Sequence, residues 1–349
     1  MFVRFPLGLS HLFFALLILN IGHLNLYAEK YAGEIYLIGN SVANNGSSNA
    51  IPAQLYSPSQ YLEFPADISP HKIYGGEIAT LPTFASLSQI YNASIAFTLD
   101  PNSQVNAFYG IVATPDILER PLLQGTKEER LNNPTLRPGT CEGCNSFRDM
   151  VYLTNLNFMH QYNFLLPRSD ISYMPIPIQF NIGATSKYFY EELEGGDYIA
   201  QNLNLDAGLC LKVFWGYNPI NKSSDRNLKL QLNGFELLPT NQRSAFSEAK
   251  VDEPIDLRWH LAFSWEEFLP EWQSRLTVGL NQKPEIGKLP AIGLEWGFRD
   301  MLFLRAGKDA QSLSAGASFA YRFIALHYAF IHQDLNNTLY QVSLQMHWL

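Results

Sequence analysis

The end of the chain alternates apolar and polar residues without a break. One face of the segment from 340 to 348 carries Tyr340, Val342, Leu344, Met346 and Trp348, and the other carries Gln341, Ser343, Gln345 and His347. A period of two is that of a β-strand whose two faces meet different surroundings. The same alternation recurs back through much of the chain and predicts an all-β fold.

Alternation and turn residues together predict about 14 strands. They span roughly 71–80, 91–99, 103–113, 150–163, 176–189, 202–216, 226–236, 257–266, 273–282, 290–298, 301–307, 312–323, 324–332 and 338–348. An even number of antiparallel strands is what bacterial single-chain membrane barrels have. A soluble sandwich would also alternate, with its apolar face inside, so the pattern alone leaves both architectures open.

The lengths of the connections favour the barrel. If the last strand ends in the periplasm, every predicted inward turn is short, and the three longest connections, 114–149, 190–201 and 237–256, all lie outside. Short periplasmic turns and long external loops are typical of transmembrane barrels. The fold predicted is therefore a transmembrane antiparallel β-barrel of about 14 strands, built from residues 71–349.

The first 70 residues divide into two segments. Residues 1–28 have the features of a secretory signal peptide, with Arg4, an apolar run from Leu12 to Leu19 and a cleavage site after Ala28. An uncleaved anchor is the alternative. Residues 29–70 include a stretch rich in Asn, Ser and Pro that is too polar to span lipid, and we expect it to fold as a plug or hatch inside the barrel. A disordered leader is the other interpretation.

Composition and charge exclude several functions. The net charge is −8, and the charged residues, 16% of the chain, are interspersed, which argues against a nucleic-acid partner, since that needs a basic face. The chain has none of the common catalytic or phosphate-binding motifs, so we expect no enzyme activity and no cofactor.

The polar residues expected to face the lumen, as a structural network of charges, are Asp206, Lys212, Arg258, His260, Arg275, Glu295, Arg322 and His347.

Two loops contain residues that could form a disulfide or bind a metal ion. Cys141 and Cys144 form a single C-x-x-C motif that lacks the second ligand pair of a zinc site. We interpret it as a small disulfide that holds a loop together in an oxidising compartment. A redox role, a metal site or free thiols are the alternatives. An acidic loop with Glu191, Glu192, Glu194 and Asp197 could hold a divalent cation, but a solvated loop is the simpler interpretation.

The last third of the chain resembles a known group. The matching pieces are Gly293 to Trp296, Leu302 to Gly307, Leu313 to Gly316, Leu326 to Phe330, and Asn337-Thr338 before Val342 to Leu344; upstream, Leu203 to Leu209 resembles a strand in the middle of the barrel. These residues resemble PorV/PorQ-type proteins of the FadL-like outer-membrane superfamily. Gly39 to Ala43 and Leu55 to Pro58 are similar to the plug segment of that group, although Ser57-Pro58-Ser59 stands where Asn-Pro-Ala is usual.

The resemblance implies a barrel of about 14 strands with an N-terminal hatch, in the outer membrane of a Gram-negative cell. It also implies transport or binding of hydrophobic or amphipathic small molecules. A PorV-like barrel that assists type IX-like secretion of surface proteins, or a structural outer-membrane protein, is the alternative. The expected partners are outer-membrane lipid, the barrel-assembly machinery, and either a hydrophobic small molecule or a secreted protein.

Overall fold

The protein is described by a computed structural model. The structure describes residues 41–67, 74–83, 88–118, 146–166, 176–193, 199–216, 225–238, 241–246, 249–254, 257–284, 289–333 and 337–348. The predicted signal peptide, the C-x-x-C motif of Cys141 and Cys144, and the acidic residues Glu194 and Asp197 lie outside these ranges.

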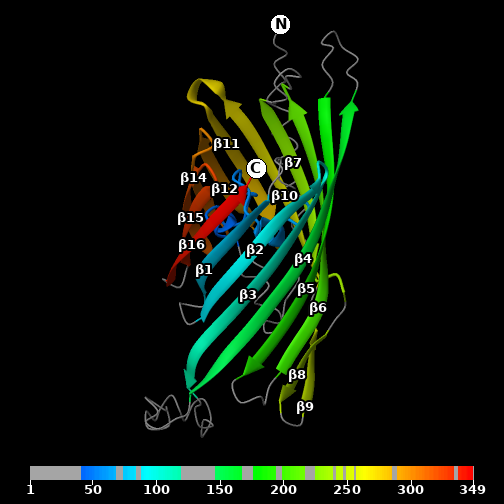
Figure 1. The fold of residues 1–349 in the computed structure, drawn as a ribbon, viewed down its shortest axis with the longest axis vertical. Coiled ribbons are helices and arrows are strands. Elements are labelled where there is room, and N and C mark those ends of the chain that lie inside the picture. The colour runs from blue at the N-terminus through cyan, green and yellow to red at the C-terminus, as the bar shows by residue number, and fades with distance from the viewer. Residues whose placement is uncertain are drawn as a thin grey trace.

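All of the predicted strands form, close to their predicted bounds. They are β1 (Tyr74–Thr83), β2 (Ser88–Asp100), β3 (Ser103–Leu118), β4 (Ser146–Leu166), β5 (Ile176–Leu193), β6 (Ile199–Trp215), β7 (Arg226–Phe235), β10 (Arg258–Leu269), β11 (Ser274–Gln282), β12 (Ala291–Phe298), β13 (Leu302–Lys308), β14 (Ser312–Tyr321), β15 (Ile324–Gln333) and β16 (Asn337–Trp348). Strands β3 to β6 run beyond their predicted ends and make one side of the wall taller than the other (Figure 1).

The strands close into a barrel. Each pairs antiparallel with its neighbours, β1 meets β16 from Tyr74↔Trp348 to Thr80↔Val342, and β5 pairs with β6. Without β8 and β9, the ring has 14 strands. We call the end that carries the β14–β15 turn the turn end, and the opposite end, where β3 stops at Leu118, the loop end.

One predicted loop differs. Residues 237–256 include a hairpin of β8 (Asn241–Phe246) and β9 (Ala249–Pro254). The hairpin joins the ring through β6, where Ala200 pairs with Ser244 and Gln201 with Arg243. It lies at the loop end, beside β6 and past the end of β7, and continues the wall there (Figure 1). Its residues lack clean alternation, which explains why the pattern did not predict it.

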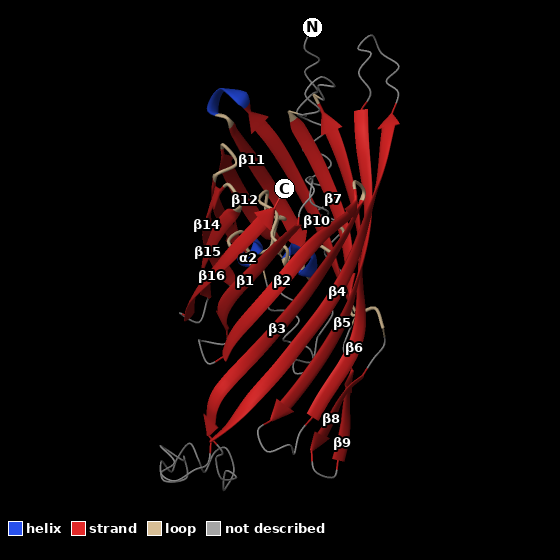
Figure 2. Cartoon of the chain, viewed as in Figure 1, coloured by secondary structure: helices blue, strands red, loops and turns tan. Residues whose placement is uncertain are grey.

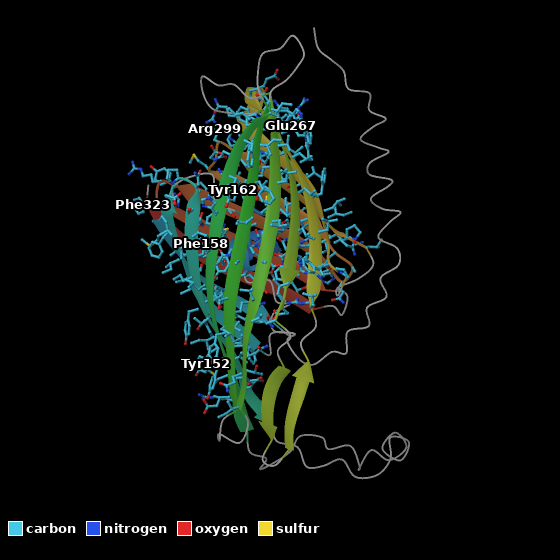
Figure 3. The ribbon with its side chains drawn as sticks, turned by 90° about the vertical axis from the view of Figure 1, so that its right-hand side faces the viewer. Tyr152, Phe158, Tyr162, Glu267, Arg299 and Phe323 are labelled. Atoms are coloured by element: carbon cyan, nitrogen blue, oxygen red, sulfur yellow. The ribbon has the colours of Figure 1, made fainter. Side chains whose placement is uncertain are left out.

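The outward face is apolar, as the alternation predicts. Residues that point away from the lumen and are at least 38% exposed include Ile78, Leu156, Phe158, Leu203, Leu211, Leu232, Ile292, Leu304, Leu326 and Leu344. Figure 3 shows Tyr152, Phe158 and Tyr162 spaced along one strand, β4, on the outside of the wall. In β16 the polar partners Gln341, Ser343 and Gln345 are buried on the opposite face.

Residues 41–67 lie inside the barrel, and we call them the plug. They contain α2 (Val42–Asn45) and the 3-10 helix η2 (Gln60–Leu62). Figure 2 shows these helices enclosed by the strands. The Oγ of Ser41 caps α2 by accepting from the backbone N–H of Asn44 at 3.4 Å. Val42, Tyr61 and Phe64 are completely buried, so the plug packs against the inner wall.

Candidate functional site

The candidate site is the contact between the plug and the inner wall. The first half of the plug is held by hydrogen bonds to four strands. Asn45 donates to Gln341 of β16 at 2.7 Å, and Ser48 bonds to Ser314 of β14 at 2.8 Å. Gln54 donates through its backbone N–H to Glu295 of β12 at 2.6 Å and through its side chain to Thr277 of β11 at 2.7 Å.

The middle of the plug is anchored to one carboxylate of β1. Ser57 and Ser59 both donate to Oε2 of Glu77, at 2.5 and 2.8 Å. Tyr56, next to them, donates its hydroxyl to Asn106 of β3 at 2.9 Å. The serines that depart from the usual plug pattern of the resembling group are thus the residues that bind Glu77. The sequence offered no signal for this pairing, because Ser and Glu are common in any polar segment.

A chain of buried polar groups joins two of these anchor points through the wall. Glu295 forms an ion pair with Arg305 of β13, and Arg305 donates to Ser318 of β14. Ser318 bonds to Nδ1 of His327 at 2.7 Å, and Nε2 of His327 bonds to Gln345 at 2.9 Å. Gln345 in turn donates to the carbonyl of Tyr56 in the plug at 2.9 Å.

The last described residue of the plug carries its strongest charge contact. One oxygen of Asp67 lies 3.1 Å from Nζ of Lys212 on β6 and 2.8 Å from Nζ of Lys229 on β7. Burial alone would raise the pKa of Asp67, but the two lysines together lower that pKa to about 2. Asp67 is therefore a carboxylate at any physiological pH.

A second buried charge cluster lies nearer the loop end. Lys187 of β5 pairs with Asp206 of β6 at 2.9 Å and also with Glu236, which follows β7. Arg258 of β10 lies 3.4 Å from Glu236 and over the ring of Phe235 at 5.6 Å. Two positive and two negative groups thus meet on the inner wall, and each charge has a partner of opposite sign.

An apolar cluster also faces the lumen. From the wall it contains Ile90, Phe108, Val112, Val151, Leu153, Met159, Phe189 and Ala329, and from the plug Val42 and Tyr61, with Leu62 packed against it. The wall residues come mainly from β2 to β5. Burial raises the pKa of the Tyr61 hydroxyl. That hydroxyl has no hydrogen-bond partner among the residues that the structure describes.

Glycines bring the plug backbone close to the wall. A side chain at Gly307 of β13 would overlap the backbone of Ser47 and lie 2.7 Å from the nitrogen of Ser48. At Gly279 of β11 it would overlap Ile51, and at Gly183 of β5 it would overlap Pro65. The plug backbone approaches β5 and β13 this closely because Gly183 and Gly307 lack a Cβ, and at Gly279 the same lack leaves room for the side chain of Ile51.

Seven of the eight predicted lumen residues lie on the inward face. Asp206, Lys212, His260 and Glu295 are buried, and Arg258, Arg275 and His347 are half-buried. Arg275 forms an ion pair with Glu266 at 2.9 Å near the turn end.

Arg322 is the exception. It lies in the turn after β14, exposed, with φ 54° and its guanidinium 5.2 Å from the ring centre of Tyr321. The predicted strand ran to residue 323, but β14 ends at Tyr321, and the tight turn takes Arg322 out of the inward row.

Several residues of the contact between the plug and the wall were not predicted, although Lys212 and Glu295, which also contact the plug, were. Asp67, Glu77, Lys229 and Arg305 were not among the predicted lumen residues, although strand parity could have found the last three. Phe303 lies on the inward face of β13 with Arg305. An apolar residue on this otherwise polar face obscures the alternation of the strand.

Several other kinds of site are not found in the described ranges. No group of three or more His, Cys, Asp or Glu side chains there could hold a metal ion. Cys210 is a free, buried thiol on β6. Among the described helices, none is both long enough and apolar enough to cross a bilayer.

Comparison with known proteins places the chain in no family. No family model matches it, and no curated protein matches it. Among solved structures, the toluene transporter TodX of Pseudomonas putida is 11% identical, covers 88% of this chain and 97% of its own, and has a TM-score of 0.42. The KdgM porin is 6% identical over 79% and 99%, with a TM-score of 0.29. The translocator domain of the autotransporter NalP from Neisseria meningitidis is 9% identical over 79% and 87%, at 0.30. Similarities this remote carry no inference about function.

Proposed function

We propose that this protein is an outer-membrane barrel that binds hydrophobic or amphipathic small molecules and passes them across the membrane, with the plug as its gate. The observation that carries the proposal is the apolar cluster inside the lumen. Transmembrane barrels have polar interiors, and a polar network lines most of this one. A patch that includes Ile90, Phe108, Val151 and Phe189 is an apolar surface. Only an apolar ligand would gain binding energy from contact with it.

The outward face supports placement in lipid. Monomeric soluble proteins rarely expose apolar patches larger than a few hundred Å², whereas exposed large apolar side chains occur here on strands all around the ring. A closed barrel leaves no unpaired edge in the hydrocarbon layer. Export through the predicted signal peptide and delivery to the outer membrane complete the proposal.

The plug supports the gating role. Val42, Tyr61 and Leu62 of the plug rest on the apolar cluster, so the plug covers the surface that a ligand would use. A ligand entering from the loop end must compete with these side chains. Binding and movement of the plug are coupled for this reason.

The test begins with the purified protein from outer-membrane fractions. An unboiled band that migrates faster on a semi-native gel than the boiled protein would report a folded barrel. Binding of the fluorescent hydrophobic probe N-phenyl-1-naphthylamine is then compared for wild type, Leu153→Asn in the lumen and Leu156→Asn on the lipid face of the same strand β4. We expect Leu153→Asn to weaken binding and Leu156→Asn to leave it unchanged.

Two results would count against the proposal. Equal binding by all three proteins would show that the apolar cluster takes no ligand. In a deletion strain, unchanged uptake of fatty acids and aromatic hydrocarbons together with loss of secreted surface proteins would replace transport with a protein-interaction role.

A further inference from the structure

The barrel wall is much shorter on one side than on the other. Strand β13 has 7 residues and its neighbours β12 and β14 have 8 and 10, whereas β4 and β5 have 21 and 18. Six strands separate β4 from β13 in either direction around the ring. The longest and the shortest strands of the ring therefore lie opposite each other, with β12 and β14 on one side of Figure 1 and β4 and β5 on the other.

On the tall side, the apolar band outside the wall is high enough for a bilayer. On β4 the outward row runs from Tyr152 to Phe164, with Thr154 and His160 as its polar members. A strand rises about 3.3 Å per residue and tilts by about 40°, so each residue adds about 2.5 Å of height. The 12 residues from Tyr152 to Phe164 (164 minus 152) therefore give a band about 30 Å tall.

On the opposite side, the apolar band is too short for a bilayer. The outward row of β13 is apolar from Leu302 to Ala306 and continues with Lys308. The four residues from Leu302 to Ala306 (306 minus 302) give about 10 Å of apolar height, and the outward row of β12 from Ile292 to Phe298 gives about 15 Å. Transmembrane barrels present an apolar band about 25 Å tall. This side therefore falls short by about 10 Å or more.

Basic side chains close the short band at both ends. At the loop end, Lys308 is exposed and pairs in the register with Ile292 and Leu313, which are 53% and 55% exposed. At the turn end, Arg299 and Arg322 are exposed in the turns that follow β12 and β14. Long cationic side chains keep their charged ends at the level of the lipid headgroups. These three groups therefore mark the two surfaces of the bilayer on the short side.

A tilt of the barrel cannot supply the missing height. The path through a flat bilayer lengthens by the same factor on both sides of a tilted cylinder, so the difference between β4 and β13 persists. A hydrophobic surface shorter than the bilayer is accommodated by local thinning of the bilayer. Phospholipids with short acyl chains allow this thinning at the lowest cost, because their chains need not be compressed.

We propose that the outward face of β12 and β13, here called the short face, binds a patch of thinned bilayer that is enriched in short-chain phospholipids. Lys308 contacts the phosphates of one leaflet, and Arg299 and Arg322 contact those of the other. The outward face of β4 and β5, here called the tall face, keeps longer lipids. The inference rests on the part of the proposed function that places the outward face in lipid, and on nothing in the lumen.

The experiment measures the lipid preference beside each face of the full-length protein. Leu304→Cys on the short face and Leu156→Cys on the tall face are matched, because each replaces an outward leucine, 44% and 58% exposed. Both are made with Cys141→Ser and Cys144→Ser and labelled with dansyl, while Cys210 is buried and stays unlabelled. The proteins are placed in vesicles that mix dilauroyl and dioleoyl phosphatidylcholine. Either lipid in turn carries a nitroxide that quenches dansyl, and the ratio of the two quenching strengths is compared between the faces.

We expect this ratio to favour the dilauroyl lipid about twofold or more at the β13 label relative to the β4 label. Equal ratios at the two labels would overturn the inference and leave the proposed function standing. Quenching of the β4 label by both lipids and of the β13 label by neither would overturn it in favour of a protein partner on the short face. The absence of quenching at both labels would overturn the placement in lipid, and the proposed function with it.

A further variant tests the part played by the basic edge. Lys308→Leu lengthens the apolar row of β13 toward the loop end, so it should reduce the preference of the β13 label for the dilauroyl lipid and leave the β4 label unchanged. An unchanged preference at β13 would overturn the role of Lys308 as the limit of the band. If Leu304→Cys does not fold, as judged by its unboiled band, Ala306→Cys takes its place, because Ala306 is the next outward residue of β13.

Discussion

The backbone N–H of Gln54 donates to the Glu295 carboxylate at 2.6 Å, so the plug and a wall strand share one buried charged group. The other oxygen of Glu295 is engaged by Arg305, and both side chains are 0% exposed. The charge pair of the wall is thereby part of the binding surface for the plug. A change at Glu295 should affect both the barrel and the plug.

Glu295→Ala should destabilise the protein by about 3–5 kcal/mol, because it leaves Arg305 as a buried charge without its carboxylate. The midpoint temperature at which the fast-migrating folded band disappears measures the loss. Glu267→Ala is the matched control, since Glu267 pairs with Arg226 at 2.8 Å on the exposed surface, and pairs of that kind contribute about 0–1 kcal/mol. Equal losses for the two variants would contradict the role assigned to Glu295.

Gly307→Ala should displace the plug. A methyl group there overlaps the backbone of Ser47, and a backbone contact cannot be relieved by a side-chain rotation. Single-channel conductance in a planar bilayer should rise, while the barrel keeps its heat-modifiable band. Gly76→Ala is the control, because its new methyl would lie 3.6 Å from the nearest atom. A closed channel in Gly307→Ala would show that the plug adapts without leaving its place.

The fold could be predicted from the sequence because the barrel repeats one physical rule along every strand. Because lipid lies outside and a polar lumen inside, apolar and polar residues must alternate along each strand. In β12 the outward face carries Ile292, Leu294 and Trp296, and the inward face carries Gly293 and Glu295. The rule holds wherever both environments are uniform. It fails in β13, where inward Phe303 precedes Arg305, because the plug makes part of the lumen apolar.

The candidate site was only partly predictable for the same reason. Lys212 follows from parity, but its partner Asp67 lies 145 residues earlier (212 minus 67), in a segment without a period. Pairing between a plug and a wall depends on where the plug chain runs through the lumen. No local pattern encodes that path, so Ser57 with Glu77 and Asp67 with Lys229 had to come from the structure.

Acid should release the end of the plug that Asp67 anchors. The folded-state pKa of about 2 lies below the ordinary value of 3.8, so this ion pair contributes on the order of 2 kcal/mol above about pH 4. The contribution is lost as the pH falls through 2. Pepsin cleavage of the plug should therefore begin between pH 4 and pH 2 in the wild type. Asp67→Asn should show equal cleavage at both pH values, and a wild-type plug still protected at pH 1.5 would contradict this.

Leu344→Arg should destabilise the protein by up to about 2–4 kcal/mol, because it places a charge in the lipid belt. Leu344 is 40% exposed on the outward face of β16, between Val342 and Met346. An arginine at the neighbouring Gln345 would not be a neutral comparison, because the Gln345 side chain donates to the carbonyl of Tyr56 in the plug. Phe323→Arg provides one, because Phe323 lies at the turn end, where an added arginine costs about 0–1 kcal/mol near the interface. The two variants are compared by urea-induced unfolding in lipid vesicles. Equal costs, or a larger cost at Phe323, would mean that the outward face of this barrel does not meet lipid.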